Sequence, residues 1–172
     1  PTFDNYIDQF KIFIKTIQAK GTVIYCDEDS IVKNIVESDD VNLLKQPYSI
    51  PQHLIDNGIT KLITENETIS LEIFGDHNLL NLNAAKLACS QLNISDIQFY
   101  EAIKSFKGAT RRLELLGKNE HTAIYKDFAH SPSKLKATIQ AVKQQFPDRE
   151  LIAVMELHTF ISLNENFLNE YA

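Results

Sequence analysis

The stretch HTAIYKDFAHSPSKLKATIQAVKQQFPDRELIAVMEL, residues 121–157, carries the strongest fold signal in the chain. Its first part, 121–128, has strand-like composition, and its last part, 150–157, is an almost continuous apolar run of the kind seen in strands that are buried on both faces. Between them, 131–146 shows helical spacing of apolar residues, with Ser131 as N-cap and Pro132 at the first helical position. This order predicts a strand–helix–strand unit, and therefore an α/β fold whose ligand site lies beyond the carboxyl ends of the strands.

Upstream of this unit the sequence predicts further mixed structure. We expect helices at 3–19, 27–38, 75–92 and 95–106, a short buried strand at 22–26, and a hairpin at 61–75 that turns at 65–68. Residues 40–60 are interrupted by Pro47, Pro51 and Gly58 and resist assignment. A change of character at KGATRR, 107–112, predicts a boundary between domains 1–107 and 108–172.

Composition narrows the class of protein. The chain has 172 residues, of which 44% are hydrophobic and 23% charged, as in ordinary globular domains. A net charge of −6 argues against general binding to nucleic acid or to anionic membranes. Cys26 and Cys89 are isolated, and there is neither a signal-peptide pattern nor an apolar run of the ~18 residues that a membrane span needs. We therefore expect a cytoplasmic protein.

The helix at GDHNLLNLNAA, 75–85, begins with an unusual number of polar side chains. Asparagine is a poor helix former, so Asn78 and Asn81, three residues apart on one face, need a reason. A carboxamide matches the hydrogen-bonding edge of adenine, and a helix N-terminus favours phosphate. The alternative is that Asp76 or Asn78 only caps the helix.

Two further clusters have ligand-binding chemistry. Asp127 ends a predicted strand and His130 lies before the next helix, where a carboxylate suits ribose hydroxyls and an imidazole suits phosphate. Arg111 and Arg112 lie at the predicted boundary, and arginine forms forked contacts with phosphate oxygens. The alternatives are an acidic loop, an exposed histidine and solvated surface arginines. No histidine pair has metal-ligand spacing, so we expect no metal ligands in this chain.

Taken in order, three segments resemble the Mur ligases, the ATP-dependent amide-bond ligases of bacterial cell-wall precursor synthesis. GDHNLLNLNAA resembles the family pattern G-x-H-N-x-x-N-x-x-A-A, FKGATRRLE resembles F-x-G-x-x-R-R-x-E, and KDFAHSPSKLKATIQAV resembles D-D-Y/F-A-H-H-P-x-x-x-x-A-T-x-x-A. Lys126 and Ser131 depart from the third pattern. The resemblance implies the second half of a central ATP-binding domain, followed by the first part of a Rossmann-like C-terminal domain.

The resemblance also implies roles for individual residues. Asn78 and Asn81 would read adenine with His77 beside the nucleotide, Arg111 and Arg112 would reach phosphates, Asp127 would hold the ribose and His130 would lie near the nucleotide. Arg112 and His130 would act in catalysis.

The implied reaction joins UDP-N-acetylmuramate to an amine through an acyl phosphate. DFAH and MELHTFISLNENFL favour the branch that adds the peptide L-alanyl-γ-D-glutamyl-meso-diaminopimelate during cell-wall recycling, and the alternative is the branch that adds L-alanine. A non-catalytic nucleotide-binding module is an alternative of another class. No G-x-x-x-x-G-K-[ST] loop occurs in the sequence. The resemblance implies that this loop and the Mg²⁺ ligands lie upstream, and we therefore expect residues 1–172 alone to be inactive.

Overall fold

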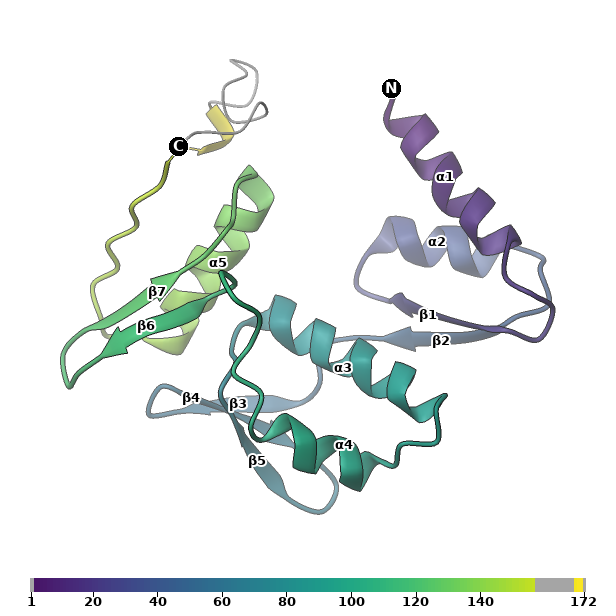
Figure 1. The fold of residues 1–172 in the computed structure, drawn as a ribbon. Helices are drawn as coiled ribbons and strands as arrows, with labels where there is room; N and C mark the ends of the chain where they lie inside the picture. Colours follow the sequence, from purple (N-terminus) through teal and green to yellow (C-terminus); the bar gives the residue numbers. More distant parts are fainter. Residues whose placement is uncertain (1, 157–168, 172) are drawn as a thin grey trace. The chain divides into compact units, whose positions relative to one another are not determined.

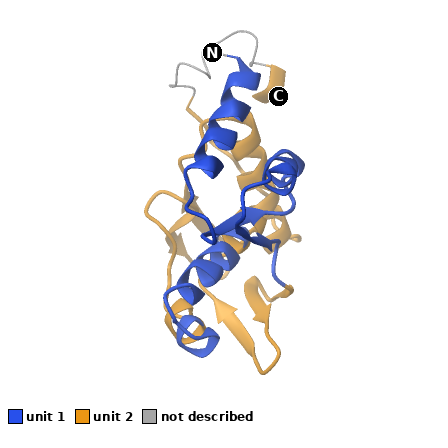
Figure 2. Cartoon of the chain, turned by 90° about the vertical axis from the view of Figure 1, so that its right-hand side faces the viewer, with its two compact units in different colours: residues 1–51, 80–99 blue, residues 52–79, 100–172 orange. Residues whose placement is uncertain are grey.

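The computed structural model describes residues 2–156 and 169–171 (Figure 1). By compactness the chain divides into two units (Figure 2). The first unit contains residues 1–51 and 80–99, and the second contains 52–79 and 100–172. Each unit mixes helices with short strands, so the predicted α/β class is confirmed.

The first unit contains a pair of parallel strands and two helices that pack with it. Strand β1 pairs with β2 in parallel, which places Tyr25 opposite Pro47. Asp29 caps α2, because its carboxylate accepts hydrogen bonds from two backbone N–H groups of the first turn at 3.0 and 3.1 Å. The bounds of these elements are α1 Phe3–Lys15, β1 Thr22–Cys26, α2 Ser30–Ser38 and β2 Leu44–Tyr48.

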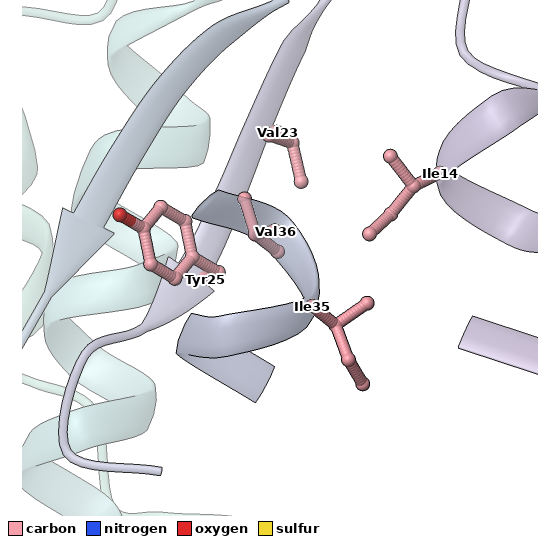
Figure 3. Packing of buried hydrophobic residues seen from close by; sticks show 5 residues of the cluster. All are labelled: Ile14, Val23, Tyr25, Ile35 and Val36. Atoms are coloured by element: carbon pink, nitrogen blue, oxygen red, sulfur yellow. The ribbon is translucent and has the colours of Figure 1, made fainter. Parts of the chain in front are cut away.

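A small apolar core holds these elements together. Side chains from α1, β1 and α2 meet in it (Figure 3), and its buried members are Ile14, Val23, Tyr25, Ile35 and Val36. The alternation of buried residues along β1 is the period-2 pattern of a strand with one covered face. The strand predicted at 22–26 is therefore confirmed.

The second unit begins with three antiparallel strands in the order β3-β4-β5. Strands β4 and β5 form the predicted hairpin, which closes where the amide of Thr64 donates to the carbonyl of Glu67 at 3.0 Å. The inner face of the sheet buries Leu62 and Ile69 almost completely. The bounds are β3 His53–Asp56, β4 Ile59–Ile63 and β5 Thr68–Leu71.

The two predicted helices that follow are confirmed as α3, Asp76–Ser90, and α4, Asp96–Ile103. Lys86 and Asp96 form an ion pair at 3.1 Å between them. The division between the compact units falls inside α3, between Leu79 and Leu80. The first turn of this helix therefore belongs to the second unit.

The C-terminal part of the second unit contains an antiparallel hairpin and a long helix. Strand β6, Glu114–Lys118, pairs with β7, Ala123–Lys126, with an irregular register between Leu115 and Gly117. Helix α5, Pro132–Gln145, has Pro132 at its start, as the sequence predicts. A short 3₁₀ helix, η1, spans Asn169–Tyr171.

The strand predicted at 150–157 is wrong over its described part. Residues 151–156 are not in a strand, and Ile152 and Val154 are 79% and 94% exposed. A strand needs a neighbour that accepts and donates its backbone hydrogen bonds, and none of the described strands pairs with this segment. The described residues therefore contain the strand and helix of the predicted unit but not its second strand.

Candidate functional site

Gly75 sets the start of α3. Its φ of +87° lies in the left-handed region, which glycine adopts without a steric cost. A Cβ at this position would also lie 2.5 Å from the Cβ of Ala141 in α5. The N-terminus of α3 can therefore approach α5 this closely only because residue 75 is glycine.

The side chain of Asn78 makes a local hydrogen bond at this helix start. Its Nδ2 donates to the carbonyl oxygen of Phe74 at 2.9 Å. This is not the predicted alternative of an N-cap, in which a side-chain oxygen accepts from a backbone N–H. The bond fixes the half-buried carboxamide and uses only one of its two N–H donors.

The other two asparagines of α3 lie in the first compact unit. Asn81 is exposed, while Asn83 donates from Nδ2 to the carbonyl of Ser49 at 2.8 Å. This bond joins α3 to the residue that follows β2, within the first unit. The role of Asn81 in reading adenine stays a prediction.

Asp127 lies directly after β7, and its carboxylate is held by three donors. Oδ1 accepts from the backbone N–H of Leu113 at 2.9 Å. Oδ2 accepts from the backbone N–H of Ala129 at 3.0 Å and from Oγ1 of Thr138 in α5 at 2.9 Å. Asp127, which is predicted to bind the ribose, therefore also connects the end of β7 to α5 and to Leu113, the residue after Arg112.

The two arginines of the predicted boundary lie in a tight turn. Arg111 has φ of +61° and Leu113 has φ of +46°, which is uncommon for residues with a Cβ. The backbone N–H of Arg111 donates to Oε2 of Glu114 at 2.8 Å, and that of Arg112 donates to the carbonyl of Ala109 at 3.0 Å. Both arginine side chains are exposed, whereas Leu113 is buried.

The imidazole of His77 lies near two of these groups, the carboxylate of Asp127 and the guanidinium of Arg112. Burial lowers the pKa of its imidazole, and the positive charge of Arg112 lowers the pKa further. The carboxylates of Asp127 and Asp76 oppose this shift. Arg112 and Asp127 therefore both lie near His77, although the three residues are far apart in the sequence.

His130 lies in the loop before α5. Its Nδ1 is 2.9 Å from the carbonyl oxygen of Phe128, and the two rings are 5.1 Å apart. The hydroxyl of Tyr171 donates to the carbonyl of His130 at 2.8 Å. These contacts fix the loop and leave Nε2 as the ring nitrogen with which His130 would meet a ligand.

A cavity of about 1100 Å³ lies within the second unit. Arg111, Asp127 and His130 contribute to its lining, but most of its wall is apolar and comes from β7, α5 and residues 150–156. Charged side chains also line it, Lys126, Lys143 and Arg149 among them. Asp127 also belongs to the candidate nucleotide site at His77, Arg112 and Asp127, so the cavity adjoins that site.

Among residues 2–156 and 169–171, no group of three His, Cys, Asp or Glu side chains could hold a metal ion. Within the same residues, no helix is long and apolar enough to cross a membrane.

Sequence reasoning missed two parts of this site. Thr138 is part of the third family pattern but received no predicted role, although it lies three residues after Leu135 and four before Val142, in the apolar stripe of α5. A polar residue within an apolar stripe is a signal that it has a buried partner. The N–H of Leu113 carries no such signal, because every residue except proline has one.

Comparison with known proteins supports the predicted class. Residues 111–161 match the family model described as Mur ligase, glutamate ligase domain. A curated UDP-N-acetylmuramate–L-alanine ligase from Caldicellulosiruptor bescii is 30% identical over 98% of this chain and 39% of its own length. The resemblance to the Mur ligases that the motifs indicate is confirmed.

Solved structures show the same fold. The UDP-N-acetylmuramate–alanine ligase from Thermotoga maritima has a TM-score of 0.63 and 18% identity, with 86% of this chain and 35% of that chain covered. A murein peptide ligase from Psychrobacter arcticus has a TM-score of 0.58 and 21% identity, with 85% and 33% covered. The chain spans about 39% of the length of the curated relatives that it matches.

Proposed function

We propose that this chain is part of an ATP-dependent ligase that joins the carboxylate of UDP-N-acetylmuramate to the amine of L-alanine. The relatives' name carries this proposal, because curated proteins similar over 98% of the chain are named for that reaction. The sequence analysis favoured a ready-made peptide as the amine. The likeness to a murein peptide ligase, at 21% identity, concerns the fold alone and does not support that preference.

The proposed chemistry has two balanced steps. A carboxylate oxygen of the muramate attacks the γ-phosphorus of ATP, which gives an acyl phosphate and ADP. The amine then attacks the acyl carbon, phosphate leaves with the former carboxylate oxygen, and the nitrogen loses a proton. Positioned cations stabilise the transferring phosphoryl group, and we propose Arg112 for this task with Arg111 beside it.

The side chains near the candidate site suit a nucleotide. Asn78 keeps its Oδ1 and one N–H for the edge of adenine, since its other N–H is used within the helix. Asn81 would add a second carboxamide from the same helix, and His77 would lie beside the nucleotide. His130 would approach from the loop before α5.

Asp127 fits a ribose through one oxygen only. Oδ2 already has two donors, whereas Oδ1 has one, so Oδ1 can accept one further hydroxyl. We therefore propose a single hydrogen bond from a ribose hydroxyl to Oδ1 of Asp127.

Reaction of ATP in such enzymes calls for Mg²⁺, which would neutralise charge on the phosphates. The described residues do not supply a cluster that suits the ion, so we derive no step through it. We further propose that residues 108–172 form the first part of a C-terminal domain. The start of the family match at residue 111 supports this boundary.

The test is ligation by the full-length enzyme that carries this chain. With UDP-N-acetylmuramate and ATP, we expect ADP formation that requires an added amine, with L-alanine preferred to L-alanyl-γ-D-glutamyl-meso-diaminopimelate. A preference for the peptide would contradict the proposed amine. ATP binding with no turnover for either amine would favour the non-catalytic nucleotide-binding module.

A further inference from the structure

The carboxylate of Asp127 joins three segments that are separate in the sequence. Its donors are the backbone of Leu113, the backbone of Ala129 and the hydroxyl of Thr138. Bonds to a charged acceptor are stronger than bonds between neutral groups. Among these donors, only Thr138 contributes a side chain, so it is the one whose contribution a substitution can remove.

The turn that this carboxylate holds is unfavourable on its own. Leu113 combines a φ of +46° with a side chain that is only 7% exposed. Its side chain packs against Phe74 and Ala141, and its N–H is bound by Asp127. A residue in a sparsely populated conformation persists only when its surroundings hold it there, and here both the side chain and the N–H are held.

Arg112 lies between the two residues with positive φ, so the direction of its side chain depends on this turn. Carboxylates bind the backbone N–H groups on both sides of Arg112: Glu114 binds that of Arg111 and Asp127 binds that of Leu113. The imidazole of His77 is within reach of the charges of both Arg112 and Asp127. Since Asp127 binds the N–H of Leu113, the orientation of its carboxylate is linked to the turn that directs Arg112.

We propose that Thr138 is a positioning residue for the ligase reaction. It orients Asp127, Asp127 holds the N–H of Leu113, and the turn then directs Arg112 toward the transferring phosphoryl group. This inference rests on the proposed function. It gives Asp127 a second role, which acts through Arg112, in addition to the proposed hydrogen bond with the ribose.

The experiment compares Thr138→Val and Thr138→Ser in the full-length enzyme. Valine removes the donor but keeps the shape, and serine restores the hydroxyl. Thr68→Val, at an exposed position in β5, is the matched control. Thr138→Ala serves as a second variant if valine prevents folding.

Two readouts are needed. The first is hydrogen–deuterium exchange of the peptide that contains Leu113, which we expect to be faster in Thr138→Val and unchanged in Thr138→Ser and Thr68→Val. The second is kinetics: we expect turnover to fall roughly tenfold in Thr138→Val with ATP affinity nearly unchanged, because the affected contact acts in the transition state. In an Arg112→Ala background the same substitution should cost little more, since the two residues act as one unit.

Several results would overturn the inference. Unchanged exchange at Leu113 would show that Thr138 does not hold the turn. A loss confined to ATP affinity, with reduced preference for ATP over 2′-deoxy-ATP, would assign Thr138 to ribose binding alone. An activity loss that matches the loss of folded protein would leave it a structural residue. If the wild-type enzyme forms no amide bond, the proposed function fails, while the exchange readout still decides whether Thr138 anchors the turn.

Discussion

The hydroxyl of Thr60 donates a 2.9 Å hydrogen bond to Oε1 of Gln145, and the two residues are only 1% and 4% exposed. Nε2 of Gln145 in turn donates to the carbonyl of Gly58 at 2.8 Å. The C-terminal end of α5 is thus joined to the β3–β4–β5 sheet by two side-chain hydrogen bonds, of which that between Thr60 and Gln145 is fully buried. These bonds connect segments that lie more than 80 residues apart in the sequence.

The first prediction concerns this pair. Thr60→Val leaves the buried Oε1 of Gln145 without its hydroxyl donor, so we expect the free energy of unfolding to fall by about 1–3 kcal/mol. Urea unfolding measures the change. Thr64→Val is the control, because its hydroxyl bonds to Glu67 at an exposed turn. An equal loss in both variants would contradict the importance of burial.

The second prediction concerns Gly75. Gly75→Ala places a Cβ 2.5 Å from that of Ala141 and imposes a φ of +87° on alanine. Both effects are unfavourable, so we expect a loss of about 2 kcal/mol or more. Gly117→Ala is the control, because a Cβ there meets nothing within 4 Å. Thermal melting of both variants checks this, and similar melting temperatures would refute the close approach of α3 and α5.

The third prediction is a dependence on pH. Burial lowers the pKa of His77 below its ordinary value of 6.5, so the unfolded chain takes up a proton more readily than the folded one. The contribution of His77 to stability is therefore complete above about pH 6.5 and is lost as the pH falls toward the lowered pKa. Denaturant unfolding across this range should show a smaller pH dependence in His77→Gln. An identical dependence in both proteins would contradict the assignment.

The fourth prediction compares three asparagines of α3. In the full-length enzyme we expect Asn78→Ala and Asn81→Ala to raise the KM for ATP about tenfold to a hundredfold, with little effect on that for UDP-N-acetylmuramate. Asn83→Ala is the control, because its side chain bonds to Ser49 within its own compact unit. Unchanged ATP kinetics in the first two variants would mean that these carboxamides serve only the helix.

Local signals in the sequence predicted much of the fold. Pro132 and the apolar stripe after it identified α5, and the alternating residues after ENET identified β5. Strand β2 was not predicted, because Pro47 argues against a strand. Proline is tolerated there because β2 pairs with β1 alone in a two-stranded sheet and is therefore an edge strand. The apolar run from Leu151 predicted a strand that the structure does not contain over residues 151–156, because apolar composition does not show whether a strand has a partner.

The candidate site was also predicted in part. The motifs singled out Asp127 and Arg112, and the structure shows that both affect the pKa of His77. Of the three donors to Asp127, two come from residues 11 and 14 positions away, Thr138 and Leu113. The quoted family pattern contains both Asp127 and Thr138, but their contact depends on how β7, α5 and the turn pack together, which a pattern of residues does not state. The ligand roles of these residues stay predictions.

The most direct test of the proposed function follows one oxygen atom. UDP-N-acetylmuramate labelled with ¹⁸O in its carboxylate is incubated with ATP, L-alanine and the full-length enzyme, and the phosphate released is examined by mass spectrometry. An acyl phosphate transfers one carboxylate oxygen to phosphate, so the account predicts one labelled oxygen in each phosphate formed during ligation. Unlabelled phosphate, or AMP and pyrophosphate in place of ADP and phosphate, would contradict it.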